Sequence, residues 1–101
     1  MHVISHRRLL DFGHQYPDAV TPLDSWFRLI KAARFASPVA LKRTFGSVDF
    51  VGQGLAVFNI GGNKYRLIAY VRYATKTNMG RVWVRNVLTH AEYTRWSERK
   101  K

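Results

Sequence analysis

An alternating segment that runs from Phe58 to Tyr73, interrupted by the turn Gly61-Gly62-Asn63, restricts the fold of this chain most. Successive side chains of a strand point to opposite faces, and a short glycine turn joins two strands as a hairpin. One face of the second strand would carry Lys64, Arg66, Ile68, Tyr70 and Arg72, and the other would carry Tyr65, Leu67, Ala69 and Val71. We therefore predict a sheet with one core face and one cationic face that also carries aromatic rings, a surface suited to phosphodiesters.

The net charge also favours a polyanionic partner. The chain of 101 residues has 17 Lys and Arg against 6 Asp and Glu, a formal charge of +11. Such a charge repels itself without helping the fold, so a partner of opposite charge is the simplest reason for it. Judged by charge alone, RNA, DNA, an acidic protein and an anionic membrane surface are all possible partners.

Composition narrows the class of protein. The length suits one domain, residues 1–101, with a modest core. No stretch is apolar enough for a membrane span and no signal peptide begins the chain, so we expect a cytoplasmic protein with no membrane association. Cysteine is absent, which excludes disulfides and zinc–thiolate sites. The four histidines form no dense ligand motif, and we expect no metal and no cofactor.

Two helices are predicted in the first third of the chain, following a short strand at Val3-Ile4. Ser5 can cap a first helix that Pro17 ends. Thr21 is a good N-cap for a second helix, with Pro22 in its first turn. The buried stripe of this second helix would be Leu23, Trp26, Phe27, Ile30 and Ala33.

The rest of the chain is predicted to be mostly strands, with a short helix at each end. A helix would start at Ser37-Pro38 and run through about Phe45, with Gly46 in the left-handed conformation as its terminator. Strands are expected at residues 55–60, 64–75 and 81–88, paired as antiparallel hairpins. Thr89 and Glu92 match a capping box that opens the last helix. The fold class is α+β: a mainly antiparallel sheet with N-terminal helices packed on one face and a short C-terminal helix.

Three segments together resemble the HigB family of bacterial toxins, within the RelE/ParE-like superfamily. They are residues 47–52, residues 57–71 and residues 84–93. The resemblance implies a small RelE-like fold and a toxin that inhibits translation by cleaving mRNA, commonly on the translating ribosome. It also implies a cognate antitoxin, HigA-like with a helix-turn-helix.

A ribonuclease that uses no metal needs a base, an acid and fixed cations around the reacting phosphate. Arg66 and Arg85 are the candidates for the cations, because a guanidinium pairs with phosphate and stays charged. Lys64 could bind the same phosphate or take a proton. The alternative for all three is a solvated cation that contributes only to the general field.

His90 is the candidate base, because it would occupy the first position of the last helix, where the positive helix end disfavours the imidazolium. Tyr93, three residues later, could orient the substrate or donate a proton, or could instead pack on Leu88 as a hydrophobic staple. Glu92 is accounted for by the capping box and receives a structural role.

Arg72, Tyr70 and Trp83 are candidates for RNA binding on the cationic face, the two aromatic residues as stacking surfaces for bases. Aromatic residues in strands more often simply pack, which is the alternative. Two other functions remain open: a ParE-like toxin that inhibits DNA gyrase, and an RNA-binding protein without enzymatic activity. The fold alone does not separate them.

Overall fold

The computed structural model describes residues 1–100, and the last residue of the predicted domain, Lys101, lies outside them. The elements in chain order are β1 (His2–Ile4), α1 (Arg7–Gln15), the short 3₁₀ helix η1 (Pro17–Ala19), α2 (Val20–Ala32), α3 (Pro38–Thr44), β2 (Asp49–Gly52), β3 (Leu55–Ile60), β4 (Tyr65–Arg72), β5 (Arg81–Thr89) and α4 (His90–Lys100). The α+β class predicted from the sequence is confirmed.

The described strands form a single mixed sheet in the order β1-β5-β4-β3-β2. The three predicted strands are β3, β4 and β5, and they pair antiparallel as expected. β1 pairs with β5 in parallel, which connects the first residues of the chain to its last strand. β2 was not predicted; it pairs antiparallel with β3, and all four of its residues are exposed. A strand that is exposed on both faces needs no alternation between apolar and polar residues, so the sequence pattern did not predict β2.

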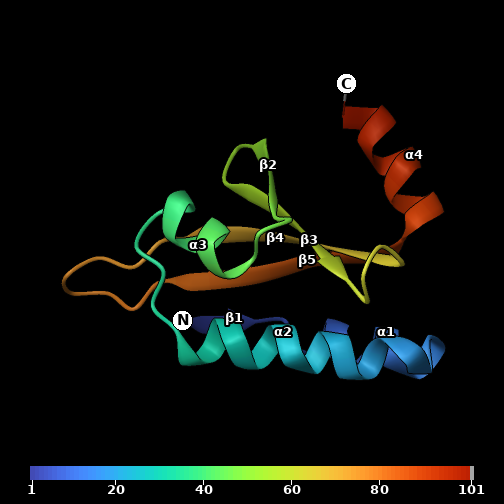
Figure 1. The fold of residues 1–101 in the computed structure, drawn as a ribbon, viewed down its shortest axis with the longest axis horizontal. Coiled ribbons are helices and arrows are strands. Elements are labelled where there is room, and N and C mark those ends of the chain that lie inside the picture. The colour runs from blue at the N-terminus through green and yellow to red at the C-terminus, as the bar shows by residue number, and fades with distance from the viewer. Residues whose placement is uncertain (101) are drawn as a thin grey trace.

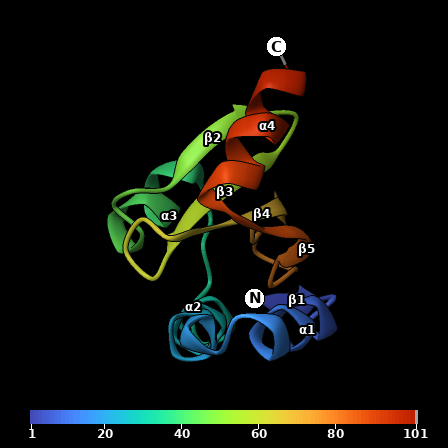
Figure 2. The same ribbon diagram turned by 90° about the vertical axis from the view of Figure 1, so that its right-hand side faces the viewer.

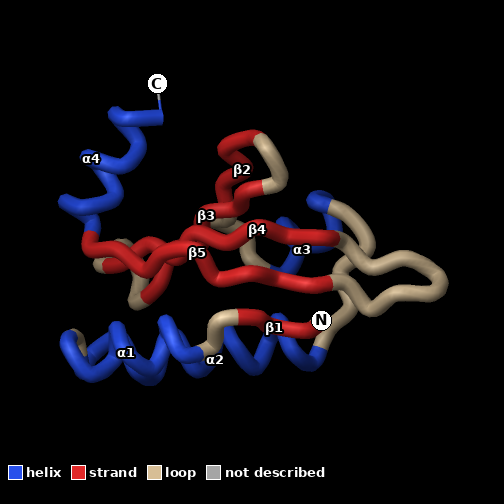
Figure 3. The backbone as a smooth tube through the Cα atoms, turned by 180° about the vertical axis from the view of Figure 1, so that it is seen from behind, coloured by secondary structure: helices blue, strands red, loops and turns tan. Residues whose placement is uncertain are grey.

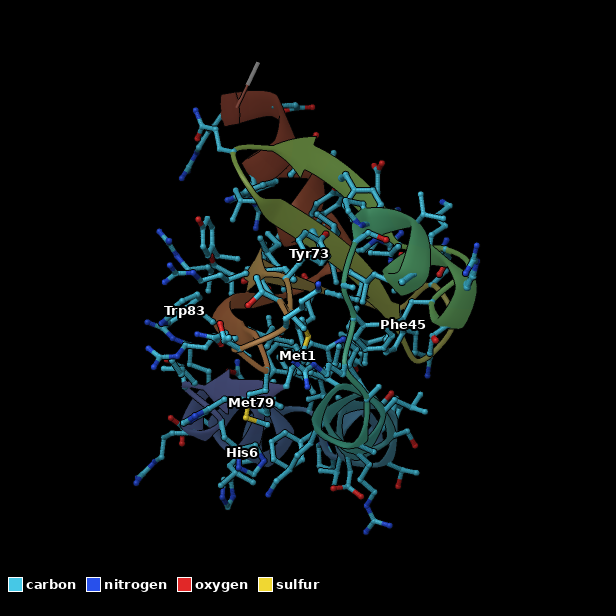
Figure 4. All side chains as sticks on the ribbon, turned by 90° about the vertical axis from the view of Figure 1, so that its left-hand side faces the viewer. Met1, His6, Phe45, Tyr73, Met79 and Trp83 are labelled. Atoms are coloured by element: carbon cyan, nitrogen blue, oxygen red, sulfur yellow. The ribbon has the colours of Figure 1, made fainter. Side chains whose placement is uncertain are left out.

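Helices lie on both sides of the sheet. Figures 1 and 2 place α1 and α2 together on one side, and α4 on the side away from them. The core fills the space between the sheet and the N-terminal helices, where the rings of Trp26 and Phe45 both pack against Phe58 at centroid distances of 5.3 and 5.1 Å. Met1, which is 1% exposed, lies in this layer (Figure 4). The N-terminal helices therefore pack on one face of the sheet, as the sequence predicted. The place of α4 on the opposite face was not predicted.

The predicted caps of the first two helices are wrong. α1 has His6 at its N-cap, and Ser5 lies upstream with φ of 71°. η1 leads directly into α2, so Ala19 takes the N-cap position and Thr21 lies inside the first turn. The buried stripe is confirmed for Leu23, Trp26 and Ile30, which are at most 3% exposed. The apolar spacing therefore predicted the buried face of α2 correctly, whereas the capping residues predicted its start incorrectly.

α3 and α4 begin as predicted. The Ser37 side chain accepts a hydrogen bond from the backbone N–H of Ala40 at 3.1 Å. Thr89 and Glu92 form the reciprocal capping box, with bonds of 2.9 and 3.2 Å. Gly46 does not end α3 in the left-handed conformation; the backbone N–H of Phe45 closes the helix on the Leu41 carbonyl instead. The long loop from β4 to β5 extends beyond the end of the sheet (Figure 3).

Candidate active site

The two faces of β4 differ as the sequence predicted, with one addition. Tyr65, Leu67, Ala69 and Val71 all belong to the core. On the opposite face, Ile68 pairs with Val57 of β3, and both are almost fully buried outside that core. This second face is thus not a uniform cationic platform. It has an apolar centre, with charged side chains around it.

Arg66 is the most constrained cation of this face, with 8% of its surface exposed. Its Nη1 donates to the carbonyls of Asn63 and Tyr65, both at 3.2 Å, and its Nη2 donates to Oδ1 of Asn63 at 2.5 Å. The guanidinium also lies over the Tyr93 ring, 5.6 Å from its centroid. A guanidinium has more N–H groups than these bonds use, so part of the fork remains for another acceptor. Arg66 is therefore held in one orientation before any ligand arrives.

Arg85 lies at a bulge in β5. Ile68 pairs with Asn86 and Ala69 pairs with Val84, which leaves Arg85 without a partner in the ladder. Bulges re-aim side chains and are frequent beside active sites. Arg85 is exposed, and no residue in the described part of the chain accepts a hydrogen bond from it. The sequence did carry a signal for the bulge: the core positions Val82 and Val84 alternate, and the next inward position, Val87, breaks that alternation.

α4 supplies two of the predicted residues. His90 is the first residue of the helix and is exposed, and its backbone N–H donates to the carbonyl of Lys64 at 3.1 Å. Tyr93 is half-buried and stacks on Trp96, with ring centroids 5.8 Å apart and planes inclined by 22°. Through its contact with Arg66, Tyr93 connects α4 to the sheet face. The bond to Lys64 ties the start of the helix to the β3–β4 turn.

Lys64 does not join Arg66, so its predicted place on the cationic face is wrong. Its Nζ forms an ion pair with Oδ2 of Asp18 at 3.0 Å, and the Tyr65 hydroxyl donates to Oδ1 of the same carboxylate at 2.6 Å. The hydrogen bond from Tyr65, followed by that from Lys64, lowers the pKa of Asp18. The same bond to Asp18 raises the pKa of Tyr65 to about 12. Lys64 lies in a turn, where the alternation of a strand does not apply, and η1 offers it a carboxylate on the helix side.

The three residues predicted to bind RNA are placed in two groups. Tyr70 and Trp83 contact one another on neighbouring strands, with ring centroids 5.4 Å apart, and together with Arg85 they line a shallow hollow of about 290 Å³. Figure 4 places the Trp83 side chain on the side of the sheet away from Phe45 of the core. Arg72 lies at the end of β4 opposite Arg81, apart from this hollow. Arg72 thus contributes charge at the end of the sheet.

A second hollow, lined in part by Arg85, contains residues that the sequence did not single out. It has a volume of about 240 Å³, lies between the sheet face and α4, and includes Gln53, Asn86 and Trp96 in its lining. Gln53 belongs to the unpredicted β2–β3 turn, and Asn86 reaches this face only because of the bulge. Helical spacing from Tyr93 would have found Trp96.

Within residues 1–100, no group of three or more His, Cys, Asp or Glu side chains is arranged to hold a metal ion. No helix in the same range is long and apolar enough to cross a membrane. The roles assigned to Arg66, Arg85, His90, Tyr93 and Lys64 stay predictions.

Comparison with known proteins gives a consistent result over most of the chain. Residues 19–96 match the family model described as HigB_toxin, RelE-like toxic component of a toxin-antitoxin system. The chain is 32% identical over 95 residues to the mRNA interferase HigB of Escherichia coli O6:H1 strain CFT073. It is 33% identical over 96 residues to the mRNA interferase toxin HigB of Escherichia coli K12 and to the mRNA interferase HigB of Shigella flexneri. Each alignment covers 92% of this chain and 88% of the relative.

Proposed function

Because the chain belongs to the HigB family of RelE-like toxins, the toxic components of toxin–antitoxin systems, we propose that it is an endoribonuclease that cleaves messenger RNA. The observation that carries the proposal is Arg66: a nearly buried guanidinium, fixed by Asn63 and stacked on Tyr93, in the strand next to the bulged Arg85. Cations fixed before the reaction stabilise developing phosphate charge more effectively than mobile ones. A merely solvated cation would need no such support.

The RNA supplies its own nucleophile in this mechanism. A base removes the proton of a 2′-hydroxyl, the oxygen attacks the adjacent phosphorus, and the 5′-oxygen leaves after receiving a proton. Arg66 and Arg85 stabilise the charge on the nonbridging oxygens. His90 acts as the base, and Tyr93 orients the substrate or gives the proton to the leaving oxygen. Lys64, which pairs with Asp18 in the absence of RNA, binds the same phosphate or takes a proton only if it exchanges this exposed ion pair for the substrate.

The partners follow from the same premise. The family implies a cognate antitoxin, and we infer that it is a HigA-like protein with a helix-turn-helix. The substrate is mRNA on the translating ribosome in the cytoplasm, where cleavage inhibits translation and growth. The net charge of +11 supports both an RNA substrate and an acidic inhibitor.

End-group analysis tests the proposal. Purified protein, incubated with translating ribosomes and a chelator, is expected to cleave mRNA and to leave a 2′,3′-cyclic phosphate, or its 3′-phosphate hydrolysis product, with a 5′-hydroxyl. A strict requirement for a divalent metal, with 5′-phosphate products, contradicts the mechanism. Absence of cleavage together with inhibition of DNA gyrase would instead identify a ParE-like toxin.

A further inference from the structure

The hollow between the sheet face and α4 has the chemistry of a site for a flat aromatic ring. Its floor is Leu55 and Ile68, and its walls include Tyr70 and Trp96. Ile68 is almost fully buried, so the floor is apolar and already packed from below. A nucleobase stacks on aromatic side chains regardless of its identity, because every base has a π-face. We call this hollow of about 240 Å³ the base cavity.

Two side-chain amides line the base cavity, those of Gln53 and Asn86. Neither amide has a hydrogen-bond partner among the side chains that the structure describes. An amide carries both donors and an acceptor, and paired amide contacts distinguish one base edge from another. Sequence-selective binding of single-stranded RNA requires aromatic rings on which a base stacks and polar groups that form hydrogen bonds with its edge. The base cavity has both.

Gln53 is held in an unfavourable backbone conformation. It has φ of 52°, between Gly52 at 93° and Gly54 at 77°. The left-handed region favours glycine, and a glutamine there is uncommon. Non-glycine residues in such conformations are concentrated at ligand sites, where the surroundings enforce them. The turn alone would be formed more easily by glycine at position 53, so we infer that the glutamine side chain serves to bind a ligand.

The turn that carries Gln53 is fixed against the sheet. A Cβ added to Gly54 would lie 2.6 Å from Cε2 of Tyr70, so only glycine allows this approach. The Gly54 carbonyl also accepts a hydrogen bond from the backbone N–H of Val71 at 3.0 Å. The turn is therefore attached to β4 at the wall of the base cavity, and the position of Gln53 is defined.

Asn86 reaches the cavity through the bulge at Arg85. Without the extra residue, the ladder that pairs Ala69 with Val84 would put Arg85 opposite Ile68. The bulge puts Asn86 there instead, above the apolar floor, and leaves Arg85 beside it. One local irregularity thus produces both an amide inside the cavity and a candidate phosphate ligand next to it.

We propose that the base cavity binds one nucleobase of the RNA, stacked against Tyr70 and Trp96, and that Gln53 and Asn86 read its edge. These two amides then determine which nucleotide lies beside the cleaved bond. This inference rests on the proposed function, since a base placed here has its phosphate next to Arg85, which lines the cavity on the strand beside that of Arg66.

Binding of RNA that the protein cannot cleave tests the inference separately from catalysis. The probes are four single-stranded RNA hexanucleotides, each of one base type, with 2′-O-methylribose throughout so that no 2′-hydroxyl can attack. The wild-type protein is expected to bind one of the four roughly tenfold or more tightly than the weakest. Four equal affinities, or no binding of any probe, would overturn the proposal.

Charge-matched variants identify the readers. Gln53→Glu and Asn86→Asp replace amide donors by oxygen acceptors and are expected to change the order of the four affinities. Gln15→Glu, on the exposed surface of α1, makes the same change of charge and is expected to weaken all four equally. If all three variants weaken the four probes uniformly, the amides read nothing and the inference is wrong.

Gln53→Gly provides a variant that folds, because glycine prefers the backbone conformation of this turn. It is expected to reduce discrimination among the four probes without lowering the melting temperature. Base-selective binding without any RNA cleavage would defeat the nuclease proposal and leave the base cavity standing. Cleavage at the same rate beside all four bases, by the wild type and by every variant, would contradict the base cavity and support the nuclease proposal.

Discussion

Replacement of Arg66 by alanine gives the sharpest test of how this site works. If the guanidinium stabilises charge that develops on the reacting phosphate, its loss removes one preorganised donor. Such a loss typically lowers the rate of the chemical step about 10²–10³-fold. The structure also predicts a cost in stability, because the substitution strips a bonding partner from two backbone carbonyls and from the Asn63 amide. We expect the free energy of unfolding to fall by about 1–3 kcal/mol.

The assay must separate these two effects. Single-turnover cleavage of a defined mRNA is measured at saturating enzyme, with thermal denaturation of each variant measured alongside it. For a chain of this size, 1 kcal/mol changes the melting temperature by roughly 4–8 °C. Cleavage is therefore compared at a temperature where circular dichroism shows every variant to be folded.

Arg28→Ala is the matched control. It removes the same single charge from α2, where the side chain is 79% exposed and pairs with Asp24 at 2.8 Å. A surface ion pair of this kind contributes only about 0.3–0.5 kcal/mol. At matched salt, Arg28→Ala should retain nearly full activity. Equal losses for the two variants would reduce Arg66 to a contributor to the general field and refute the reasoning.

The remaining predictions concern proton transfer and pH. His90→Ala should slow cleavage roughly 10²–10⁴-fold and leave RNA binding within several-fold of wild type, whereas Glu92→Gln retains the capping bond and should stay active; normal cleavage by the first variant and not the second would mean that the base was misassigned. The bond between Tyr65 and Asp18 should make the free energy of unfolding fall at both ends of the pH scale. The pKa of Asp18 is lowered in the folded state, so the contribution of Asp18 to the free energy of unfolding is lost as pH falls below about 3.8. The pKa of Tyr65 is raised, so the contribution of Tyr65 is lost as pH rises from 10.0 toward 12. Tyr65→Phe should flatten both limbs in denaturant titrations from pH 3 to 11, and an unchanged profile would show that the bond contributes no stability.

Local sequence was sufficient wherever the cause of a structure is local. The alternation in residues 65–72 determined which side chains of β4 enter the core, because the period of a strand is set by its backbone. The capping box at Thr89 determined the start of α4, because both bonds join residues three positions apart. The placement of His90 at a helix start followed from this.

Tertiary structure decided everything that depends on a distant partner. Lys64 does not lie on the cationic face, because its ammonium pairs with the carboxylate of Asp18, 46 residues away in the sequence. η1 moved the start of α2 past Thr21, and β2 formed only because β3 was there to pair with it. The pairing of β5 with β4 placed the bulge at Arg85, and the bulge put Asn86 opposite Ile68, above the floor of the base cavity.

The sequence by itself thus determined the β3–β4 and β4–β5 pairs and the start of the terminal helix, and it gave candidates for binding a phosphate, because propensity, side-chain period and capping act over a few positions. Only the tertiary structure decided which of these residues share a site. Arg66 gained its orientation from Asn63 and from Tyr93. The contact with Tyr93 joins β4 to α4, and β5 lies between these two elements in the sequence. Contacts of that kind depend on how the elements pack, and packing depends on the whole chain at once.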